Sequence, residues 1–540
     1  MAENLAPEPW WQGAVLYQIY VRSWQDTNDD GYGDLRGVIS RLDHLRWLGV
    51  DAIWLSPTMP SPDADWGYDV SDYTDVHPEL GTLDDVDELI EAAGTAGMRV
   101  LLDLVPNHTS SAHPWFIDAA SARDSAHRHY YVWADPAPAG GPPNNWLDAT
   151  GRSAWQWDDR TGQYYLHNYL PEQPDLNWWV PAVHEEFRQI LEFWFDRGVA
   201  GFRIDVAHGL YKDSLLRDNP VAEDHGPLGS RFGFSAVYSA NRPEVHAVYR
   251  DWRQIAERYA PPKMLLGETW TGDFGKLAQF YGANDELQLA FNFPFVFADF
   301  SAPALSGVVE ETFAHLPAGA CPVWTASNHD VGRFATRWCG NDERKIRLAL
   351  LVLATLPGTT VLYYGDEIGM TDVDVPAGER RDLMTASRPD PAASRDRGRT
   401  PMQWDTTAHA GFTSAQVQPW LPVGDTAGRN ASPEGRPPGS PRDVAGQMQD
   451  PDSTLWFCRR LIALRRAEFG GRPAGYQQLA SAADFWSYRV GEITVLANFS
   501  GQRRPAAPPA GQILLSSSGK DPAGGEVVLE PWQGVLYRTS

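Results

Sequence analysis

The sequence predicts an α/β protein built on a closed (β/α)₈ TIM barrel, with an inserted domain after strand 3 and a C-terminal antiparallel β domain. Three observations lead to this prediction. Short β-branched or aromatic runs alternate with amphipathic stretches over most of the chain, as in a parallel sheet covered by helices. Residues 107–173 interrupt this rhythm for longer than an ordinary loop. Residues after 470 alternate apolar and polar side chains, as in antiparallel strands.

Eight short apolar segments are expected to form the barrel strands. They are Tyr17–Val21, Ala52–Leu55, Val100–Leu104, Gly201–Val206, Met264–Gly267, Leu287–Phe291, Val323–Ala326 and Thr360–Tyr364. Segments with apolar residues at helical spacing lie between them. The expected helices are Val38–Leu48, Thr82–Ala93, Val183–Phe195, Val245–Tyr259 and Ile346–Thr355, with Thr454–Arg466 as the last helix of the barrel. Eight strand-and-helix units close a barrel.

The domain boundaries follow from these elements. Residues 1–106 and 174–470 are assigned to the catalytic barrel, 107–173 to the inserted domain and 471–540 to the C-terminal β domain. The inserted domain is rich in Trp, Tyr, Pro and Gly, and no helix is predicted in it. Residues 425–442 are full of Gly, Pro and Ser and are expected to form a surface loop.

Composition narrows the class of partner. The net charge of -25 over 540 residues argues against nucleic acid, which is bound by clustered Lys and Arg. A small neutral molecule is the easier partner. The N-terminus lacks a signal-like apolar run, and no segment is long enough to span a bilayer, so a cytoplasmic protein without a membrane partner is expected. Three scattered cysteines suit a reducing compartment. The sequence does not indicate an oligomeric state.

Polar residues gather where the expected strands end, which is where barrel enzymes carry their reactive groups. The four segments are Asp103–His108, Arg203–His208, Glu268–Trp270 and Ser327–Asp330. One such acid is commonly structural, and Arg203 with Asp205 could be no more than an ion pair at a strand end. Acids at three ends, accompanied by histidines and an arginine, are hard to explain as packing because unpaired buried carboxylates are costly.

The chemistry of this group follows partly from what the sequence lacks. It has no zinc-type Cys/His set, no phosphate-binding glycine loop and no Gly-x-Ser-x-Gly motif. Two carboxylates, one ionised and one able to hold a proton, are what glycoside cleavage needs. Asp205, kept ionised by the neighbouring Arg203, would attack the sugar. Glu268 would be the acid and base, and Asp330 would stabilise the cationic sugar.

These motifs together resemble glycoside hydrolase family 13, the α-amylase family, and within it the α-glucosidase and oligo-1,6-glucosidase branch. The resemblance covers nearly the whole chain. It rests on Leu16–Tyr20, the four strand-end segments, the signature Gln173–Asn177 and the late segment Arg399–Trp404. It implies a retaining mechanism with Asp205 as nucleophile, Glu268 as acid/base and Asp330 as transition-state stabiliser.

The same resemblance implies a set of sugar-binding residues. They are Asp65, Tyr68, His108, Tyr169, Gln173, Arg203, His329 and Arg399. In the exo-acting members, the pair that corresponds to Asp65 and Arg399 closes the subsite around the non-reducing end. Exo action is therefore expected, although Asp65 by itself could be an ordinary loop acid.

A loop after the first strand carries oxygen ligands at alternate positions. The ligands would be Asp26, Asn28, Asp30, the Tyr32 carbonyl and Asp34, as in the first part of an EF-hand loop. Gly37 stands where the bidentate glutamate of such a loop would be. The alternative is an acidic turn without a metal. The resemblance favours structural Ca²⁺, with Mg²⁺ as the alternative ion.

Two positions bear on specificity. Val206 follows the expected nucleophile, and valine there tends to accompany α-1,6 cleavage in the resembling branch; a plain core valine is the alternative. Thr150 stands where that branch usually has phenylalanine, while Tyr169 keeps an aromatic side chain on the facing segment.

The sequence thus predicts an exo-acting retaining α-glucosidase that removes terminal α-linked glucose from short oligosaccharides or small glucosides. Two alternatives use the same carboxylates: an α-glucosyl transferase and an isomerase of maltose and trehalose. The sequence does not separate water from sugar as the acceptor. A non-catalytic binding relative is disfavoured because all three carboxylates are present.

Overall fold

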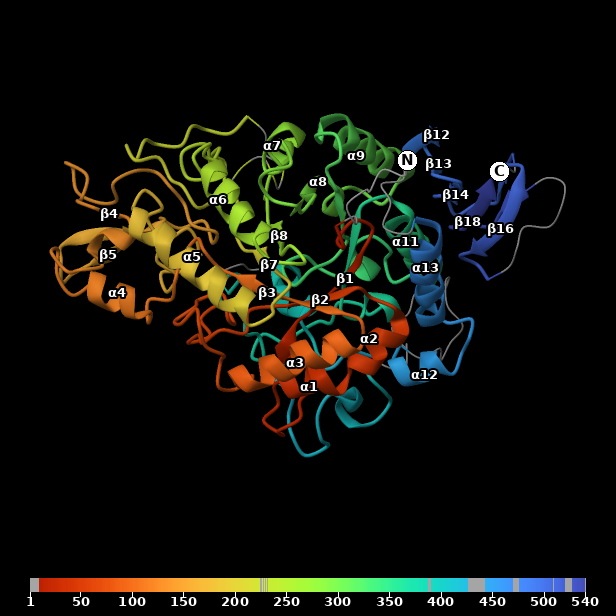
Figure 1. Ribbon diagram of the computed structural model, residues 1–540, viewed down its shortest axis with the longest axis horizontal. Helices are drawn as coiled ribbons and strands as arrows, with labels where there is room; N and C mark the ends of the chain where they lie inside the picture. Colours follow the sequence, from red (N-terminus) through yellow and green to blue (C-terminus); the bar gives the residue numbers. More distant parts are fainter. Residues whose placement is uncertain are drawn as a thin grey trace.

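The computed structural model describes residues 9–223, 226, 228, 230, 232–386, 390–425, 442–469, 475–507, 509–519 and 527–539. Its centre is an eight-stranded parallel sheet (Figure 1). The strands are β1 (Val15–Ile19), β2 (Ala52–Leu55), β3 (Arg99–Leu104), β7 (Gly201–Ile204), β8 (Met264–Gly267), β9 (Leu289–Ala290), β10 (Val323–Trp324) and β11 (Thr359–Tyr363).

The order of the strands shows that the sheet is a closed barrel. The hydrogen-bonded order is β10-β11-β1-β2-β3-β7-β8-β9. Its two ends meet through a parallel bridge between Phe291, just after β9, and Val323 in β10. Each of the eight expected strands overlaps one barrel strand, so the predicted (β/α)₈ architecture is confirmed.

The expected helices all form, with one difference. Thr82 caps α3 (Leu83–Thr95) through a capping box with Asp85, and α5 (Pro181–Asp196), α6 (Val245–Glu257), α11 (Glu343–Thr355) and α13 (Thr454–Phe469) match their predicted segments. The predicted helix Val38–Leu48 is instead two helices, α1 (Leu35–Ser40) and α2 (Leu42–Leu48). They divide at Arg41, whose φ of -110° and ψ of 8° leave the helical range.

The inserted domain holds a small antiparallel sheet in the order β4-β6-β5. Its strands are β4 (Trp133–Ala134), β5 (Trp155–Asp158) and β6 (Gln163–Leu166). No helix was predicted in this region, but α4 (Pro114–Ala119) forms there. His113 caps α4 by accepting the N–H of Trp115, and proline occupies the first helical turn. Six residues are too few for a visible helical period.

The C-terminal region forms a separate antiparallel sheet in the order β12-β13-β14-β18-β16, as expected (Figure 1). The strands are β12 (Tyr476–Ala482), β13 (Phe485–Val490), β14 (Ile493–Asn498), β16 (Gly511–Ser516) and β18 (Gly534–Thr539), beside the pair β15 (Arg504–Ala506) and β17 (Val527–Leu529). Tyr488 shares a hydrogen bond with Thr355 of α11, and Tyr476 stacks on Phe313 of α9 (Ala302–His315), so this sheet packs on the barrel helices.

Five helices were not predicted. Four of them are short, namely α7 (Phe274–Gln279), α8 (Phe293–Val296), α10 (Phe334–Arg337) and α12 (Val444–Met448), and the fifth is the longer α9 (Ala302–His315). Most of the expected surface loop 425–442 lies outside the described residues. No helix among the described residues is both long and apolar enough to cross a membrane.

A buried lysine ties the inserted domain to the barrel. The ammonium of Lys212, in the loop after β7, lies 2.6 Å from Oδ2 of Asp175 and donates to Oδ1 of Asn107 at 2.7 Å. Asp175 also accepts the backbone N–H and the side-chain amide of Asn168 at 2.7 Å each. All four side chains are buried. Lys212 therefore neutralises a carboxylate where three segments meet.

Replacing Lys212 with alanine should destabilise the protein strongly. The change leaves Asp175 buried without its cation, which costs roughly 3–5 kcal/mol in comparable buried pairs. We expect a clear fall in Tm in a thermal unfolding scan. Lys276→Ala removes an exposed lysine and is the matched control. A Tm for Lys212→Ala equal to that of the control would show that the ion pair of Lys212 with Asp175 does not stabilise the fold.

Candidate active site

A pocket of about 800 Å³ opens at the carboxyl ends of the barrel strands. Its wall contains nine of the eleven residues predicted to be catalytic or sugar-binding. They are Asp65, Tyr68, His108, Tyr169, Gln173, Asp205, Glu268, His329 and Asp330. The other two, Arg203 and Arg399, are buried and contact these residues from behind. The barrel therefore brings the predicted set together.

Strand register places the central carboxylates side by side. Ile204 of β7 pairs with Gly267 of β8, and the ladder continues when Glu268 donates its N–H to Ile204 at 2.9 Å. Asp205 likewise donates its N–H to Leu104 of β3 at 2.8 Å. Asp205 and Glu268 therefore directly follow the ends of two neighbouring barrel strands, β7 and β8.

One buried guanidinium serves three of these acids. Arg203 approaches Asp205 at 2.7 Å and Asp103 at 2.9 Å through Nη1, and Glu268 at 3.0 Å through Nη2. Its side chain is 1% exposed, and its carbon Cζ lies 5.2 Å from the ring of Trp54. Asp103 also accepts hydrogen bonds from the Tyr68 hydroxyl and the Trp54 indole.

The sequence predicts that Arg203 keeps Asp205 ionised. In the structure Arg203 is shared among three carboxylates, and this changes the expected pKa of Asp205. Burial raises the pKa of Asp205 well above its usual value, Arg203 opposes that rise, and Glu268 adds to it. Burial likewise raises the pKa of Asp103 to about 7. Three carboxylates around one cation carry excess negative charge, so the cluster tends to hold a proton.

Val206 has an unusual backbone that reaches the acid/base candidate. Its φ of +46° lies in the left-handed region, which is rare for a β-branched residue. In this conformation its N–H donates to Oε2 of Glu268 at 2.8 Å. The side chain lines the pocket, so Val206 is not simply a core valine. Strain of roughly 1–3 kcal/mol is typical of such positions at functional sites.

Asp330, which follows β10, sits among positive groups in the same pocket. Arg395 and Arg399 donate to its Oδ1 at 2.9 and 3.1 Å, and His329 Nε2 lies 3.0 Å from Oδ2. Burial disfavours the charge of Asp330, but these neighbours outweigh it and hold its pKa well below the usual range. Burial lowers the pKa of His329. Asp330 is therefore ionised, whereas the pKa values of Asp103 and Asp205 are raised.

Asp65 and Arg399, the pair expected to close the subsite, are linked through Arg395 and Asp330 and not by a direct ion pair. Asp65 instead accepts from Arg395 at 2.6 Å, and Arg395 also binds Asp330 and Asp382. Arg399 donates to the carbonyl of His329 at 2.8 Å. Arg395 was not predicted as a site residue, although it stands four residues before Arg399 in the same arginine-rich run. The turn Arg395–Gly398 brings both side chains to Asp330.

The remaining predicted residues form an aromatic and amide wall. Tyr68 stacks on His329 with the ring centroids 5.0 Å apart, and Tyr169 lies against His108 at 5.3 Å. Gln173 donates to Asp65 at 3.4 Å. Burial lowers the pKa of His108 to about 4, so its imidazole is neutral near pH 7. It faces the pocket as a hydrogen-bonding group without charge.

Thr150 does not contribute to this wall. Its hydroxyl and its N–H both donate to Oδ1 of Asp148, at 2.7 and 2.8 Å. The preceding residue, Ala149, reaches the pocket instead. The aromatic side chain that relatives of this branch were expected to place here is absent from this segment.

The predicted calcium loop is folded by its own oxygens. Asp26 accepts the N–H groups of Asn28, Asp29 and Gly31 at 2.9–3.0 Å, and Asn28 and Asp30 accept those of Asp30 and Tyr32. Asp34 accepts from Thr27 and caps α1. The donor set is all oxygen, which fits Ca²⁺. However, Asp26, Asp30 and Asp34 are not gathered into one compact group of ligand atoms.

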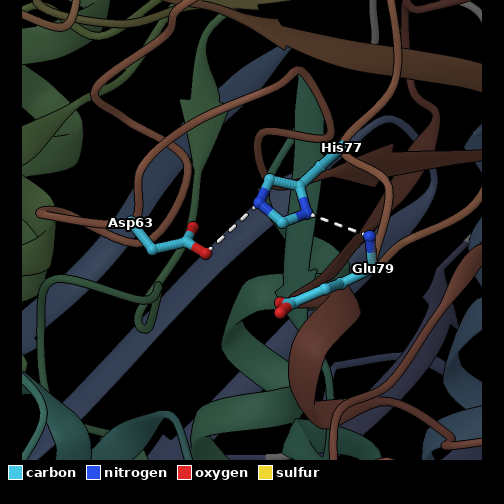
Figure 2. Close-up of side chains that lie close together, drawn as sticks. All are labelled: Asp63, His77 and Glu79. Carbon is cyan, nitrogen blue, oxygen red and sulfur yellow. Dashed lines mark hydrogen bonds and ion pairs between the residues drawn. The ribbon is translucent and has the colours of Figure 1, made fainter. Parts of the chain in front are cut away.

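Within the described part of the chain, the one compact group of three potential metal ligands is Asp63, His77 and Glu79 (Figure 2). Arg22 already supplies a cation there, 2.7 Å from Asp63 and 3.0 Å from Glu79. His77 accepts the N–H of Glu79 through Nδ1, and its Nε2 lies 3.0 Å from the carbonyl of Ser61. Both imidazole nitrogens are therefore engaged, which makes the group a structural ion-pair network.

Comparisons with known proteins agree with this geometry. The family model of the α-amylase catalytic domain matches residues 18–468. A probable α-glucosidase of Rhizobium meliloti is 39% identical over 470 residues, covering 85% of this chain and 83% of the relative. An oligo-1,6-glucosidase of Heyndrickxia coagulans is 36% identical over 503 residues, covering 85% of each chain.

Solved structures extend the likeness to three dimensions. The crystal structure of an α-glucosyl transfer enzyme superposes with a TM-score of 0.90 at 35% identity. It covers 98% of this chain and 100% of its own. The chain belongs to the α-amylase family, glycoside hydrolase family 13, in its branch of α-glucosidases and oligo-1,6-glucosidases.

Proposed function

We propose that this protein is an exo-acting, retaining α-glucosidase that releases terminal α-linked glucose from short oligosaccharides or small glucosides. The observation that carries the proposal is the shared guanidinium of Arg203. It holds Asp205 and Glu268 within 3.0 Å of its two terminal nitrogens, at the wall of one pocket. Retaining glycosidases need two carboxyl groups only about 5–5.5 Å apart, which this arrangement supports.

The reaction would proceed in two displacements. An oxygen of Asp205 attacks the anomeric carbon and the bond to the leaving oxygen breaks, while Glu268 gives its proton to that oxygen. Water then attacks the glucosyl ester, Glu268 takes a proton from the water, and Asp205 leaves as a carboxylate. Asp330, held ionised by His329, Arg395 and Arg399, stabilises the positive charge of each transition state.

The exo preference is supported by the ion pairs of Arg395. This residue joins Asp65, from the loop after β2, to Asp330 after β10, so one end of the pocket is bridged by charged side chains. A bridged end suits a terminal glucose better than the middle of a long chain. Val206 lines the same pocket beside the nucleophile, and its influence on linkage is part of this proposal.

Glucosyl transfer is the second candidate. The relative that superposes with a TM-score of 0.90 is an α-glucosyl transfer enzyme, and the two displacements are the same for a sugar or alcohol acceptor as for water. The choice depends on how the outer pocket excludes water. Product chromatography at high acceptor concentration separates hydrolysis from transfer.

Asp205→Asn should abolish turnover while the fold is kept, because the amide is nearly isosteric but cannot attack the sugar. We expect a loss of at least about 10⁴-fold in kcat. The measurement is a panel of maltose, isomaltose, sucrose and an aryl α-glucoside, with anomeric products followed by NMR. Wild-type release of β-glucose, or of no glucose from any substrate, would overturn the proposal.

Asp103→Asn should extend activity to lower pH. Asp205 has to be ionised to attack, so kcat/KM falls as the pH drops through its raised pKa. Removing the negative charge of Asp103 lowers that pKa, since Asp103 is one of the groups that raise it. We expect the acidic limb of the profile to move to lower pH. Asp135→Asn, an exposed acid of the inserted domain, is the control, and an equal shift in both would refute the coupling.

We also propose that the loop from Asp26 to Asp34 binds a structural Ca²⁺ ion. The ligands would be Asp26, Asn28, Asp30, the Tyr32 carbonyl and Asp34, all of them oxygen donors, and binding would draw the carboxylates closer together than they lie in this structure. The missing bidentate glutamate at Gly37 predicts weaker binding than a complete EF-hand loop, and Mg²⁺ is the alternative ion.

Calcium should raise the Tm of chelator-treated protein in a saturable manner, because an ion that binds only the folded state adds about 2.7 kcal/mol at 100 times its Kd. Asp30→Asn should weaken this response. Asp29→Asn is the matched control, since Asp29 lies in the same loop but is not a proposed ligand. The same response in both variants would place the ion elsewhere, and Mg²⁺ in parallel tests the alternative.

A further inference from the structure

Two apolar side chains are exposed at the outer part of the pocket. Phe232 is 49% exposed and Val237 is 38% exposed. Both come from the loop between β7 and α6, and both line the pocket together with Ala236. Apolar surface that lines a binding pocket and remains open to water commonly marks a contact with a ligand.

The ring of Phe232 packs beside Thr150, the position of the inserted domain where an aromatic side chain was expected. Gly151 follows Thr150 with a φ of +88°, and a Cβ atom built on it would lie only 2.9 Å from Cε1 of Phe232. The ring therefore rests against the bare backbone of Gly151. Because Thr150 is turned to Asp148, the aromatic surface at this place is supplied by the β7–α6 loop.

The backbone of Phe232 is strained, and neighbouring contacts hold its loop in place. Its φ of +51° lies in the left-handed region, which costs roughly 1–3 kcal/mol for such a residue. A bridge between Val221 and Phe234 closes the loop around it. Asn145 of the inserted domain then holds the loop through Asn219 at 2.8 Å and Asp218 at 3.0 Å. Strain and half-exposure together are unexpected for a side chain that serves only folding.

We propose that Phe232 is an aromatic platform for the leaving group, and that it favours substrates with an aromatic aglycone. This inference rests on the α-glucosidase function proposed above. With glucose at the carboxylate end, the leaving group would extend along the wall of Phe232, Ala236 and Val237. An aryl ring can stack on Phe232 and cover these side chains, whereas a sugar would gain no stacked ring and would depend on neighbouring lining residues such as Ser235 for hydrogen bonds.

The test compares two substrates that share glucose and differ in the leaving group. 4-Nitrophenyl α-glucoside can reach the platform, whereas α-glucosyl fluoride cannot. For Phe232→Ala we expect the ratio of kcat/KM for the aryl substrate to that for the fluoride to fall about tenfold, as for loss of one ring–ring contact. Phe232→Trp should keep the ratio within about twofold of wild type.

Further variants decide between stacking and other roles. Phe232→Leu keeps apolar volume without a ring, so its ratio should fall as it does for alanine. A ratio that stays at the wild-type value would overturn stacking. Leu215→Ala removes a side chain that is 74% exposed in the same loop and is outside the pocket wall, and its ratio should not change. An equal loss for both substrates in Phe232→Ala would also overturn the platform.

Maltose tests the preference for aromatic aglycones, because its leaving group is a sugar. We expect Phe232→Ala to lose less kcat/KM on maltose than on the aryl substrate, and equal losses would refute the preference. A wild-type protein that hydrolyses neither the fluoride nor the aryl glucoside would instead refute the proposed function. Failure of the platform and failure of the function are therefore distinguishable.

Discussion

The contact on which the site depends is the buried guanidinium of Arg203 with three carboxylates. An unpaired carboxylate at this depth would be neutralised or would destabilise the fold. Burial, which Arg203 only partly offsets, raises the pKa of Asp103 to about 7, and the neighbouring Glu268 adds to this rise. In the same pocket, two arginines and a histidine surround one acid, Asp330. The pocket thus combines a carboxylate cluster that tends to hold a proton with an acid that stays ionised.

Buried cations also hold the loops around the site, because each one forms ion pairs or hydrogen bonds with more than one segment. Lys212 joins the inserted domain to the loop after β7, and Arg395 joins the loops that carry Asp65 and Asp330. Backbone groups complete the connection between inserted domain and barrel, since the indole of Trp146 donates to the carbonyl of Arg217 at 2.8 Å. Apolar contacts add to these ties, since Leu216 and Tyr238 of the β7–α6 loop pack against the inserted-domain cluster that contains Trp146.

The inner half of the site could be predicted from the sequence because barrel geometry fixes it. Once β7 and β8 are recognised as neighbouring strands, Asp205 and Glu268 must emerge side by side. The pairing of Asp65 with Arg395 could not be predicted, because Arg395 and Arg399 are equally plausible in sequence. A short turn after residue 394 decides between them. Helix α4 escaped prediction for a related reason, since it is set by a cap and a proline, not by periodicity.

The outer half of the pocket is formed by loops. The position of a loop residue in the sequence does not predict where its side chain lies in the pocket. Thr150 shows that the aromatic side chain expected at this one position of the inserted domain is absent. Phe232, some eighty residues later in the sequence, lies against the adjacent Gly151. Only the fold brings these two segments together. Because the carboxylates stand on strand ends and the aromatic surface on a loop, the leaving-group contact can change without disturbing the register that aligns Asp205 with Glu268. Chemistry and leaving-group preference are therefore carried by separate parts of the same pocket.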